Sequence, residues 1–166
     1  MRLTQWTDYS LRVLMYCAAC QERVKPPTVA EIAEAHGISR SHLMKIVMSL
    51  ASYGWLETTR GRGGGLRLLK PASELRLGDV VRRTESDLML VECFDPAGNQ
   101  CKLDGHCRLK GVFREAMQSY FDTLDAYTLA DLMAPPTLAR SAALQPISPP
   151  LPKVRKSVKA GKSPTH

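Results

Sequence analysis

The chain has 166 residues, of which 44% are hydrophobic, and this suits one globular domain with flanking segments. Residues 1–6 contain no apolar signal region, and no run approaches the ~18 apolar residues of a membrane span, so we expect a cytoplasmic protein with reduced thiols and no membrane partner. The net charge of +7 does not by itself indicate or exclude a nucleic-acid partner. Residues 135–166 hold six of the 23 basic residues and none of the 16 acidic ones, so the rest of the chain has 17 basic and 16 acidic residues.

The first helix is predicted to begin at Thr7, an N-cap residue type, and to end near Glu22. Asp8 lies in its first turn, where a carboxylate suits the positive end of the helix dipole. Cys17 and Cys20 lie one turn apart on one face of this helix. Free cysteine is among the most buried residue types, so we interpret this pair as core residues, with metal ligation as the alternative.

A helix-turn-helix is predicted next. The second helix opens with the capping box Thr28-x-x-Glu31 and ends at Gly37, a residue typical of helix C-termini. The third helix is expected over residues 40–53, and its N-terminal half is the part that meets base edges in the major groove. The exposed candidates for DNA contact in that half are Arg40, Ser41, His42 and Lys45. A solvated face on an ordinary helical hairpin is the alternative interpretation.

A β-hairpin wing is predicted after the third helix, with strands over residues 55–59 and 66–70 around the Gly-rich turn 60–65. The glycines let the backbone come close to another surface. The wing carries positive charges and no acid, which is the composition of a phosphate-contacting segment, at Arg60, Arg62, Arg67 and Lys70. Nucleotide binding is disfavoured, because the glycines are not followed by the Lys-Ser/Thr of a phosphate-binding loop.

Three cysteines, Cys93, Cys101 and Cys107, share one segment whose other residues bend the chain. An irregular loop of this length is unusual in a small domain unless something organises it. Thiolates are soft ligands, so the loop can close around zinc or an iron–sulfur cluster. Disulfides are disfavoured, because three is an odd number and a cytoplasmic protein keeps its thiols reduced.

Two further helices are expected, a short one over residues 77–86 and a long one over about 108–127. The long helix carries a broad apolar stripe, which predicts packing on a partner subunit as well as on its own chain. The stripe consists of Leu109, Val112, Phe113, Ala116, Met117, Tyr120, Phe121 and Leu124. A last helical turn is expected over residues 129–133. Seven of the 11 prolines fall in residues 135–166, so we expect a disordered tail there.

Taken together, Thr7-Asp8-Tyr9-Ser10, the wing and the spacing Cys93-x7-Cys101-x5-Cys107 resemble the family of bacterial winged-helix iron–sulfur regulators. The pattern is most similar to the nitric-oxide-sensing NsrR branch, over residues 1–134. The resemblance implies a mainly α fold with a small β-hairpin wing, a winged helix-turn-helix plus a long dimerisation helix. The implied divisions are a DNA-binding domain over 1–87, a cysteine cluster-binding loop over 88–107, a dimerisation helix over 108–134 and a Pro/Lys-rich tail over 135–166.

The resemblance also implies a ligand set for the cluster. In the NsrR branch the loop cysteines ligate it, and a carboxylate from the other subunit completes the set, which here gives Cys93, Cys101, Cys107 and Asp8. His106 is the rival fourth ligand. The IscR-like pattern places a histidine three residues after the last cysteine, where this sequence has Lys110. A 4Fe-4S cluster is favoured and a 2Fe-2S cluster is the alternative.

The function that the resemblance implies is a homodimeric repressor that binds double-stranded operator DNA when cluster-loaded and releases it on nitrosylation. The alternatives are an IscR-like sensor of cluster or redox status and a zinc or thiol switch without a cluster. An enzyme is not expected, because metalloprotease, nucleophile-elbow and nucleotide-loop motifs are missing from the sequence. An electron-transfer protein is disfavoured, because ferredoxin-type clusters usually need four cysteines.

Overall fold

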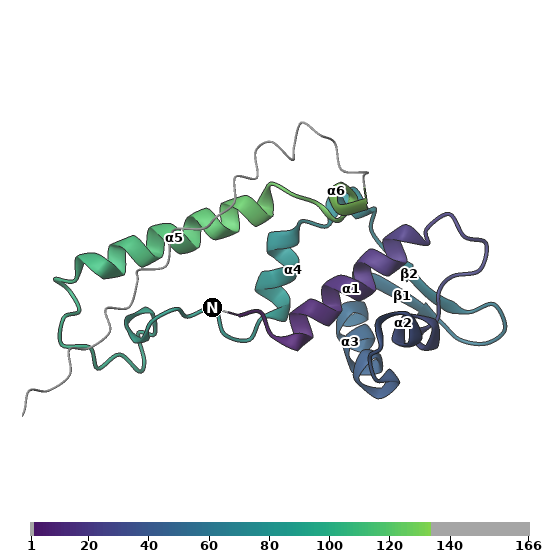
Figure 1. Cartoon of the computed structure of the whole chain (residues 1–166), viewed down its shortest axis with the longest axis horizontal. Helices are drawn as coiled ribbons and strands as arrows, with labels where there is room; N and C mark the ends of the chain where they lie inside the picture. Colours follow the sequence, from purple (N-terminus) through teal and green to yellow (C-terminus); the bar gives the residue numbers. More distant parts are fainter. Residues whose placement is uncertain (1, 134–166) are drawn as a thin grey trace, which may run out of the picture. The chain divides into compact units, whose positions relative to one another are not determined.

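The structure is a computed structural model that describes residues 2–133. It is mainly helical with one two-stranded antiparallel hairpin (Figure 1), as the sequence predicts. The elements are α1 (Gln5–Ala19), α2 (Val29–His36), α3 (Arg40–Ser52), β1 (Leu56–Thr59), β2 (Gly65–Leu68), η1 (Ala72–Glu74), α4 (Leu77–Thr84), η2 (Glu92–Phe94), α5 (Arg108–Asp125) and α6 (Leu129–Met133). The predicted disordered tail lies outside the described residues. Among those described, no helix is long and apolar enough to cross a membrane.

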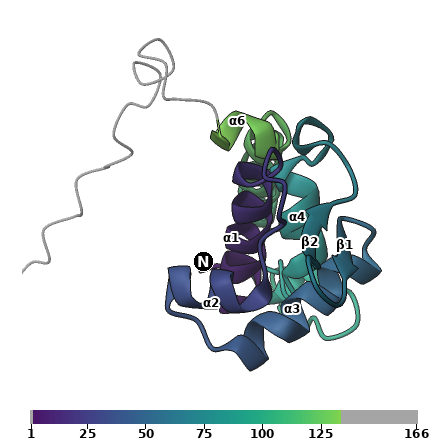
Figure 2. The same cartoon turned by 90° about the vertical axis from the view of Figure 1, so that its right-hand side faces the viewer.

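Helix α1 is central to the packing, because it contacts α3, α4, α6 and β2 (Figure 2). Its inward face buries Val13, Leu14 and Cys17. The expectation that Thr7 caps this helix is wrong. The cap is Thr4, whose side chain accepts a hydrogen bond from the Thr7 backbone nitrogen at 3.4 Å. Threonine can cap a helix at either position. Thr7 is fully buried inside the fold, so the cap position falls to the exposed Thr4.

The helix-turn-helix and the wing follow the local signals of the sequence. Thr28 and Ser39 cap α2 and α3. Each side chain accepts a hydrogen bond from the backbone nitrogen three residues further along the chain. Gly37 ends α2 with a φ of 64°, a left-handed conformation that costs a glycine little. The two strands form four antiparallel residue pairs in a single register, from Leu56 opposite Leu68 to Thr59 opposite Gly65.

Cys17 and Cys20 are buried, at 2% and 5% exposure, as expected for core residues. Burial raises the pKa of Cys17 to about 12, with a smaller contribution from Cys20. The Cys17 thiol is therefore protonated at neutral pH. Burial of both thiols, and the lack of a group of three or more metal-ligand side chains among the described residues, fit core residues rather than metal ligands.

A polar contact joins the start of α1 to the end of α4. The Glu85 carboxylate accepts hydrogen bonds from the Thr4 backbone nitrogen at 2.7 Å and from the Thr7 hydroxyl at 2.6 Å. The buried Thr84 hydroxyl lies 3.0 Å from the Thr7 hydroxyl and donates to it. Burial alone would raise the pKa of Glu85, but the hydrogen bonds from Thr7 and Thr4 outweigh it and lower this pKa below its ordinary value.

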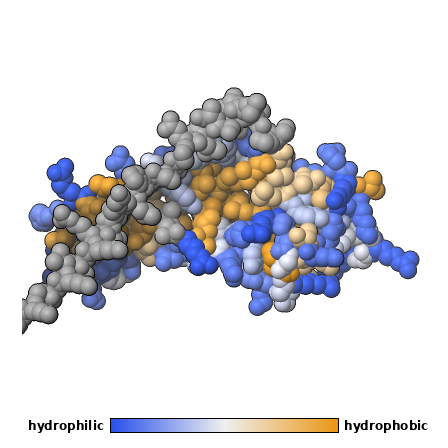
Figure 3. Space-filling model, in the orientation of Figure 1, coloured by the Kyte–Doolittle hydropathy of each residue, from blue (hydrophilic) through white to orange (hydrophobic). Residues whose placement is uncertain are grey.

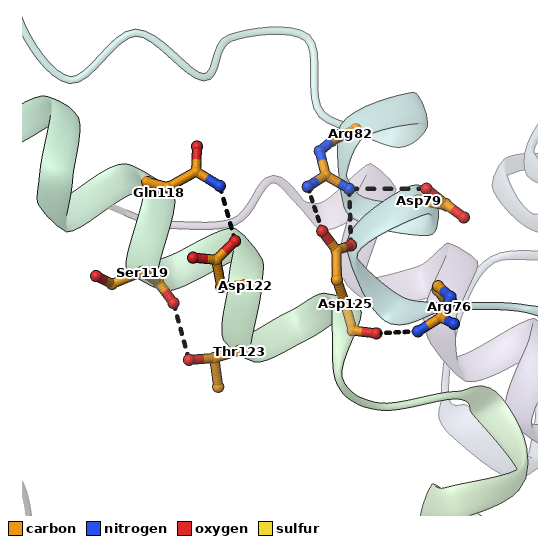
Figure 4. Close-up of polar contacts among 8 residues, drawn as sticks. All are labelled: Arg76, Asp79, Arg82, Gln118, Ser119, Asp122, Thr123 and Asp125. Carbon is orange, nitrogen blue, oxygen red and sulfur yellow. Dashed lines mark hydrogen bonds and ion pairs between the residues drawn. The ribbon is translucent and has the colours of Figure 1, made fainter.

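Helix α5 is joined to α4 near its C-terminal end by a polar cluster (Figure 4). The Arg82 guanidinium donates to both Asp125 oxygens, at 2.8 and 2.6 Å, and lies 4.3 Å from the centre of the Phe121 ring. Arg76 donates to the Asp125 backbone carbonyl. A Cβ atom at Gly78 would lie 1.8 Å from an Asp125 oxygen, so this glycine lets α5 approach α4 closely.

None of the 18 residues of α5 is buried in the described chain. Leu109 and Val112 are 56% and 58% exposed, and Figure 3 shows hydrophobic surface along this helix where the grey atoms leave it visible. An amphipathic helix of this length is stabilised mainly by packing of its apolar face. The N-terminal part of that face is therefore exposed in the described chain, while Phe121 nearer its C-terminal end contacts Arg82 of α4.

The hydrogen bonds at Glu85 predict a pH dependence of stability. A depressed carboxyl pKa contributes stability that is present above the unfolded pKa, near 4.5, and is lost as the pH falls through the lower folded pKa. We expect Glu85→Gln to lower the free energy of unfolding at pH 7 by about 1 kcal/mol, with the difference from wild type shrinking below pH ~4.5. Urea unfolding between pH 7 and 3 measures this. Glu57→Gln, an exposed substitution on β1, is the control, and an equal effect of both variants would contradict the prediction.

The bidentate geometry at Asp125 predicts that Arg82 and Asp125 are energetically coupled. A double-mutant cycle on the free energy of unfolding with Arg82→Ala and Asp125→Ala is expected to show a larger coupling than the same cycle on Arg12 and Asp8. The Arg12–Asp8 pair lies within one helix, with side chains that are 44% and 45% exposed, so it does not connect two elements of the fold. Equal couplings would show that the α4–α5 contact does not depend on this ion pair.

Candidate functional site

The cysteine loop begins in η2 and ends at α5. Cys93 lies within η2, Cys101 lies in the following irregular segment, and Cys107 is the N-cap residue of α5. All three thiols are free and partly buried. The N-terminal end of a helix favours negative charge, so the position of Cys107 suits a thiolate.

Side chains within the loop hold its middle in place. Asp104 pairs with the Lys110 ammonium at 2.5 Å and accepts from the Asn99 amide, while Asn99 in turn accepts from the Cys101 backbone nitrogen at 3.0 Å. The Lys110 hydrogen bond is the main cause of the lowered pKa of Asp104. Lys110 therefore anchors the loop to α5, a role for Asp104 and Lys110 that the sequence analysis missed.

The three cysteines fit a soft metal centre by chemistry, although one chain does not assemble it. Within residues 2–133 the structure has no group of three or more His, Cys, Asp or Glu side chains placed to hold a metal ion. Three unpaired thiols on one loop are nevertheless the donor type that iron–sulfur clusters use. The donor set is therefore suitable, and closing it requires the loop to fold around its ligand.

Asp8 lies on α1, apart from the cysteine loop. Figure 1 shows the loop at the N-terminal end of α5, whereas α1 packs against α4, which contacts the other end of α5. The Asp8 carboxylate pairs with Arg12, with both oxygens 3.1 Å from the Arg12 Nε atom. This ion pair, one turn along the helix, raises the pKa of Arg12. His106, the rival ligand, is exposed on the loop.

The candidate DNA-contacting residues fall into two groups. Arg40, Ser41 and Lys45 are exposed on α3, and Arg60 and Arg62 are exposed in the turn of the wing. These five side chains are available to a partner.

The remaining two candidates contact their own chain. The His42 ring lies edge-on to Tyr9 at 5.3 Å and is 6.2 Å from the ring of Trp6, so it packs α3 against α1. The Arg67 guanidinium donates to the Val24 carbonyl at 3.1 Å, which joins β2 to the loop after α1. Helical spacing alone gave no sign of these contacts, because the partners are 33 or more residues away in the sequence.

Comparison with known proteins is consistent with this arrangement. Residues 3–135 match the Rrf2 family, described as "Iron-dependent Transcriptional regulator". The chain is 49% identical over 133 residues to the HTH-type transcriptional regulator NsrR of Geobacillus kaustophilus, covering 80% of this chain and 90% of that protein. It is 47% identical to NsrR of Bacillus subtilis over the same shares.

A solved structure, "T. potens IscR", has the same fold. It superposes with a TM-score of 0.64 at 22% identity and covers 80% of this chain and 86% of its own. At that identity the likeness concerns the fold alone. The family match and the NsrR relatives extend over the winged helix-turn-helix, the cysteine loop and α5. The chain therefore belongs to the Rrf2 family of transcriptional regulators.

Proposed function

We propose that this protein is a homodimeric repressor that binds operator DNA while it carries an iron–sulfur cluster and releases the DNA in response to nitric oxide. The observation that carries the proposal is the position of Cys93, Cys101 and Cys107. The three free thiols lie on the segment that joins a winged helix-turn-helix to a helix with no buried residue. The similarity to NsrR proteins supports the choice of nitric oxide as the effector.

The proposed division of labour follows the elements. Residues 2–87 form the DNA-binding domain, residues 88–107 the cluster-binding loop, and residues 108–133 the described part of the dimerisation segment. DNA contact is assigned to Arg40, Ser41, Lys45, Arg60 and Arg62, with His42 and Arg67 adding contacts where their intrachain partners leave them accessible. The unburied apolar face of α5 supports pairing with a second copy.

The cluster is assigned to Cys93, Cys101 and Cys107, with Asp8 of the partner subunit as the fourth ligand. When bound, the cluster supplies iron that nitric oxide can bind. Arg12 holds the Asp8 carboxylate in place, and Lys110 holds the loop through Asp104. A carboxylate is a harder and more labile partner for iron than a thiolate, which suits a site that a small diatomic molecule enters. We favour 4Fe-4S over 2Fe-2S on the resemblance to NsrR.

The transmission to DNA is assigned to α1. Asp8 lies in the first turn of this helix, and Tyr9 beside it contacts His42 on α3. If Asp8 ligates the cluster on the partner subunit's loop, that bond would restrain α1 relative to this loop. Release of that restraint frees the two α3 helices from the spacing that two half-sites require.

A thiol or zinc switch is the second candidate, because the thiols of Cys93, Cys101 and Cys107 are free and thiolates also bind zinc. The two candidates differ in colour and metal content. Anaerobic purification followed by iron, sulfide and zinc counts and an absorption spectrum separates them.

The cluster proposal predicts the behaviour of cysteine variants. Replacing Cys93, Cys101 or Cys107 with Ala is expected to abolish the visible absorption and to lower operator affinity at least tenfold in gel-shift titrations. The matched control is Cys20→Ala, which removes a buried core thiol and is expected to keep both. Nitric oxide is expected to release wild-type protein from the operator, whereas equal affinity with and without nitric oxide would contradict the sensing function.

The wing proposal predicts a change in salt dependence. Each phosphate contact contributes about 0.9 to the slope of log affinity against log salt concentration. The variant Arg60→Gln/Arg62→Gln is therefore expected to lower that slope by about 2 on operator and unrelated duplexes alike. We expect a smaller change for Arg67→Gln, whose guanidinium binds the Val24 carbonyl. An unchanged slope in the double variant would remove the wing from the interface.

A further inference from the structure

A groove of about 530 Å³ lies between α3 and the wing. Figure 2 shows the two elements side by side, and α3 contacts β1 directly. Its lining includes Arg40, Met44 and Met48 from α3 and Thr58, Arg60 and Gly61 from the hairpin. The groove is thus built from α3 and the wing, which the proposed function assigns to DNA binding, together with residues 28–30 at the start of α2.

The α3 side of this groove is apolar where a DNA-contacting helix is usually polar. Met44 and Met48 are 41% and 67% exposed, whereas the neighbouring Leu43, Ile46 and Val47 are buried. Arg40, Met44 and Met48 recur every four residues, so they form one line along α3. Because His42 packs on α1, this line is the part of the helix that faces the wing.

The wing side of the groove is fixed at its base by contacts with Pro27, which lies just before α2. The Leu66 backbone nitrogen donates to the Pro27 carbonyl at 2.8 Å, and a Cβ at Gly65 would lie 2.6 Å from that same oxygen. A side chain at position 65 would therefore push the hairpin away. The groove is an open, preformed feature of the fold rather than a gap between loosely placed segments.

Charge and chemistry select one occupant. Arg40 and Arg60 line the groove, and no acidic residue does, so a polyanion is favoured. Among the bases, thymine alone presents a methyl group at the major-groove edge of DNA. A duplex with thymine at the matching positions therefore satisfies the arginines with phosphates and the methionines with methyl groups.

We propose that Met44 and Met48 are specificity-determining residues that contact thymine methyl groups in each operator half-site. The inference rests on the proposed DNA-binding function and adds the bases that the protein selects. The unbranched, polarisable side chain of methionine adapts to the irregular edge of the major groove. Arg40 and Arg60 contribute affinity, and the two methionines discriminate between A·T and G·C pairs.

The test uses deoxyuridine, which differs from thymidine only by the missing methyl group. An operator duplex is selected from a random library with cluster-loaded, full-length protein, and each thymine is then replaced singly by deoxyuridine. Loss of one buried methyl is expected to weaken binding about fourfold at one or two thymines per half-site. With Met44→Ala or Met48→Ala, the sensitivity at the matching thymine is expected to disappear.

Val24→Ala is the matched control, because the Val24 side chain is 97% exposed and does not line the groove. It is expected to keep the full deoxyuridine pattern. The inference is overturned if no thymine is sensitive, or if both groove variants weaken binding while the sensitivity of every thymine stays as in wild type. A selection that returns no preferred duplex would instead overturn sequence-selective DNA binding itself, and this inference with it.

Discussion

The contact between the Glu85 carboxylate and the first turn of α1 is the interaction on which the arrangement of the functional parts depends. It holds the helix that carries Asp8 against α4, and the segment leading to the cysteines begins directly after it. Thr7 and Thr84 are buried hydroxyls, so their hydrogen bonds cannot be exchanged for water at no cost. Glu85 and Tyr120 line the same pocket, so α5 lies beside this carboxylate, and burial and the negative charge of Glu85 raise the pKa of Tyr120.

The second constraint is the way α5 is attached. The Arg82–Asp125 ion pair attaches the C-terminal end of α5 to α4, and the lack of a side chain at Gly78 lets the two helices approach closely. The N-terminal end of α5 begins at Cys107. One end of the helix is thus tied to the winged domain and the other to the cysteine loop. The loop therefore lies next to the exposed N-terminal part of α5, which is the surface proposed to pair with a second copy.

The surface proposed to bind DNA offers two kinds of contact. Arg60 and Arg62 in the exposed turn suit phosphates, which position a protein without reading sequence, whereas the groove beside them offers the apolar side chains of Met44 and Met48. His42 lies between this surface and α1, in contact with Tyr9. Helix α3 is therefore packed against α1, the helix that carries the proposed fourth ligand.

The sequence by itself determined the features that depend on neighbouring residues. The caps at Thr28 and Ser39, the left-handed Gly37, the hairpin and α6 were all predictable, because each is decided within a few residues; so was family membership, which the cysteine spacing and the wing carry together. Only the tertiary structure decided that Thr4 rather than Thr7 caps α1, that Glu85 joins two helices, and that Met44 and Met48 face the wing. These three features depend on contacts between residues that are far apart in the chain. No local sequence pattern encodes such contacts.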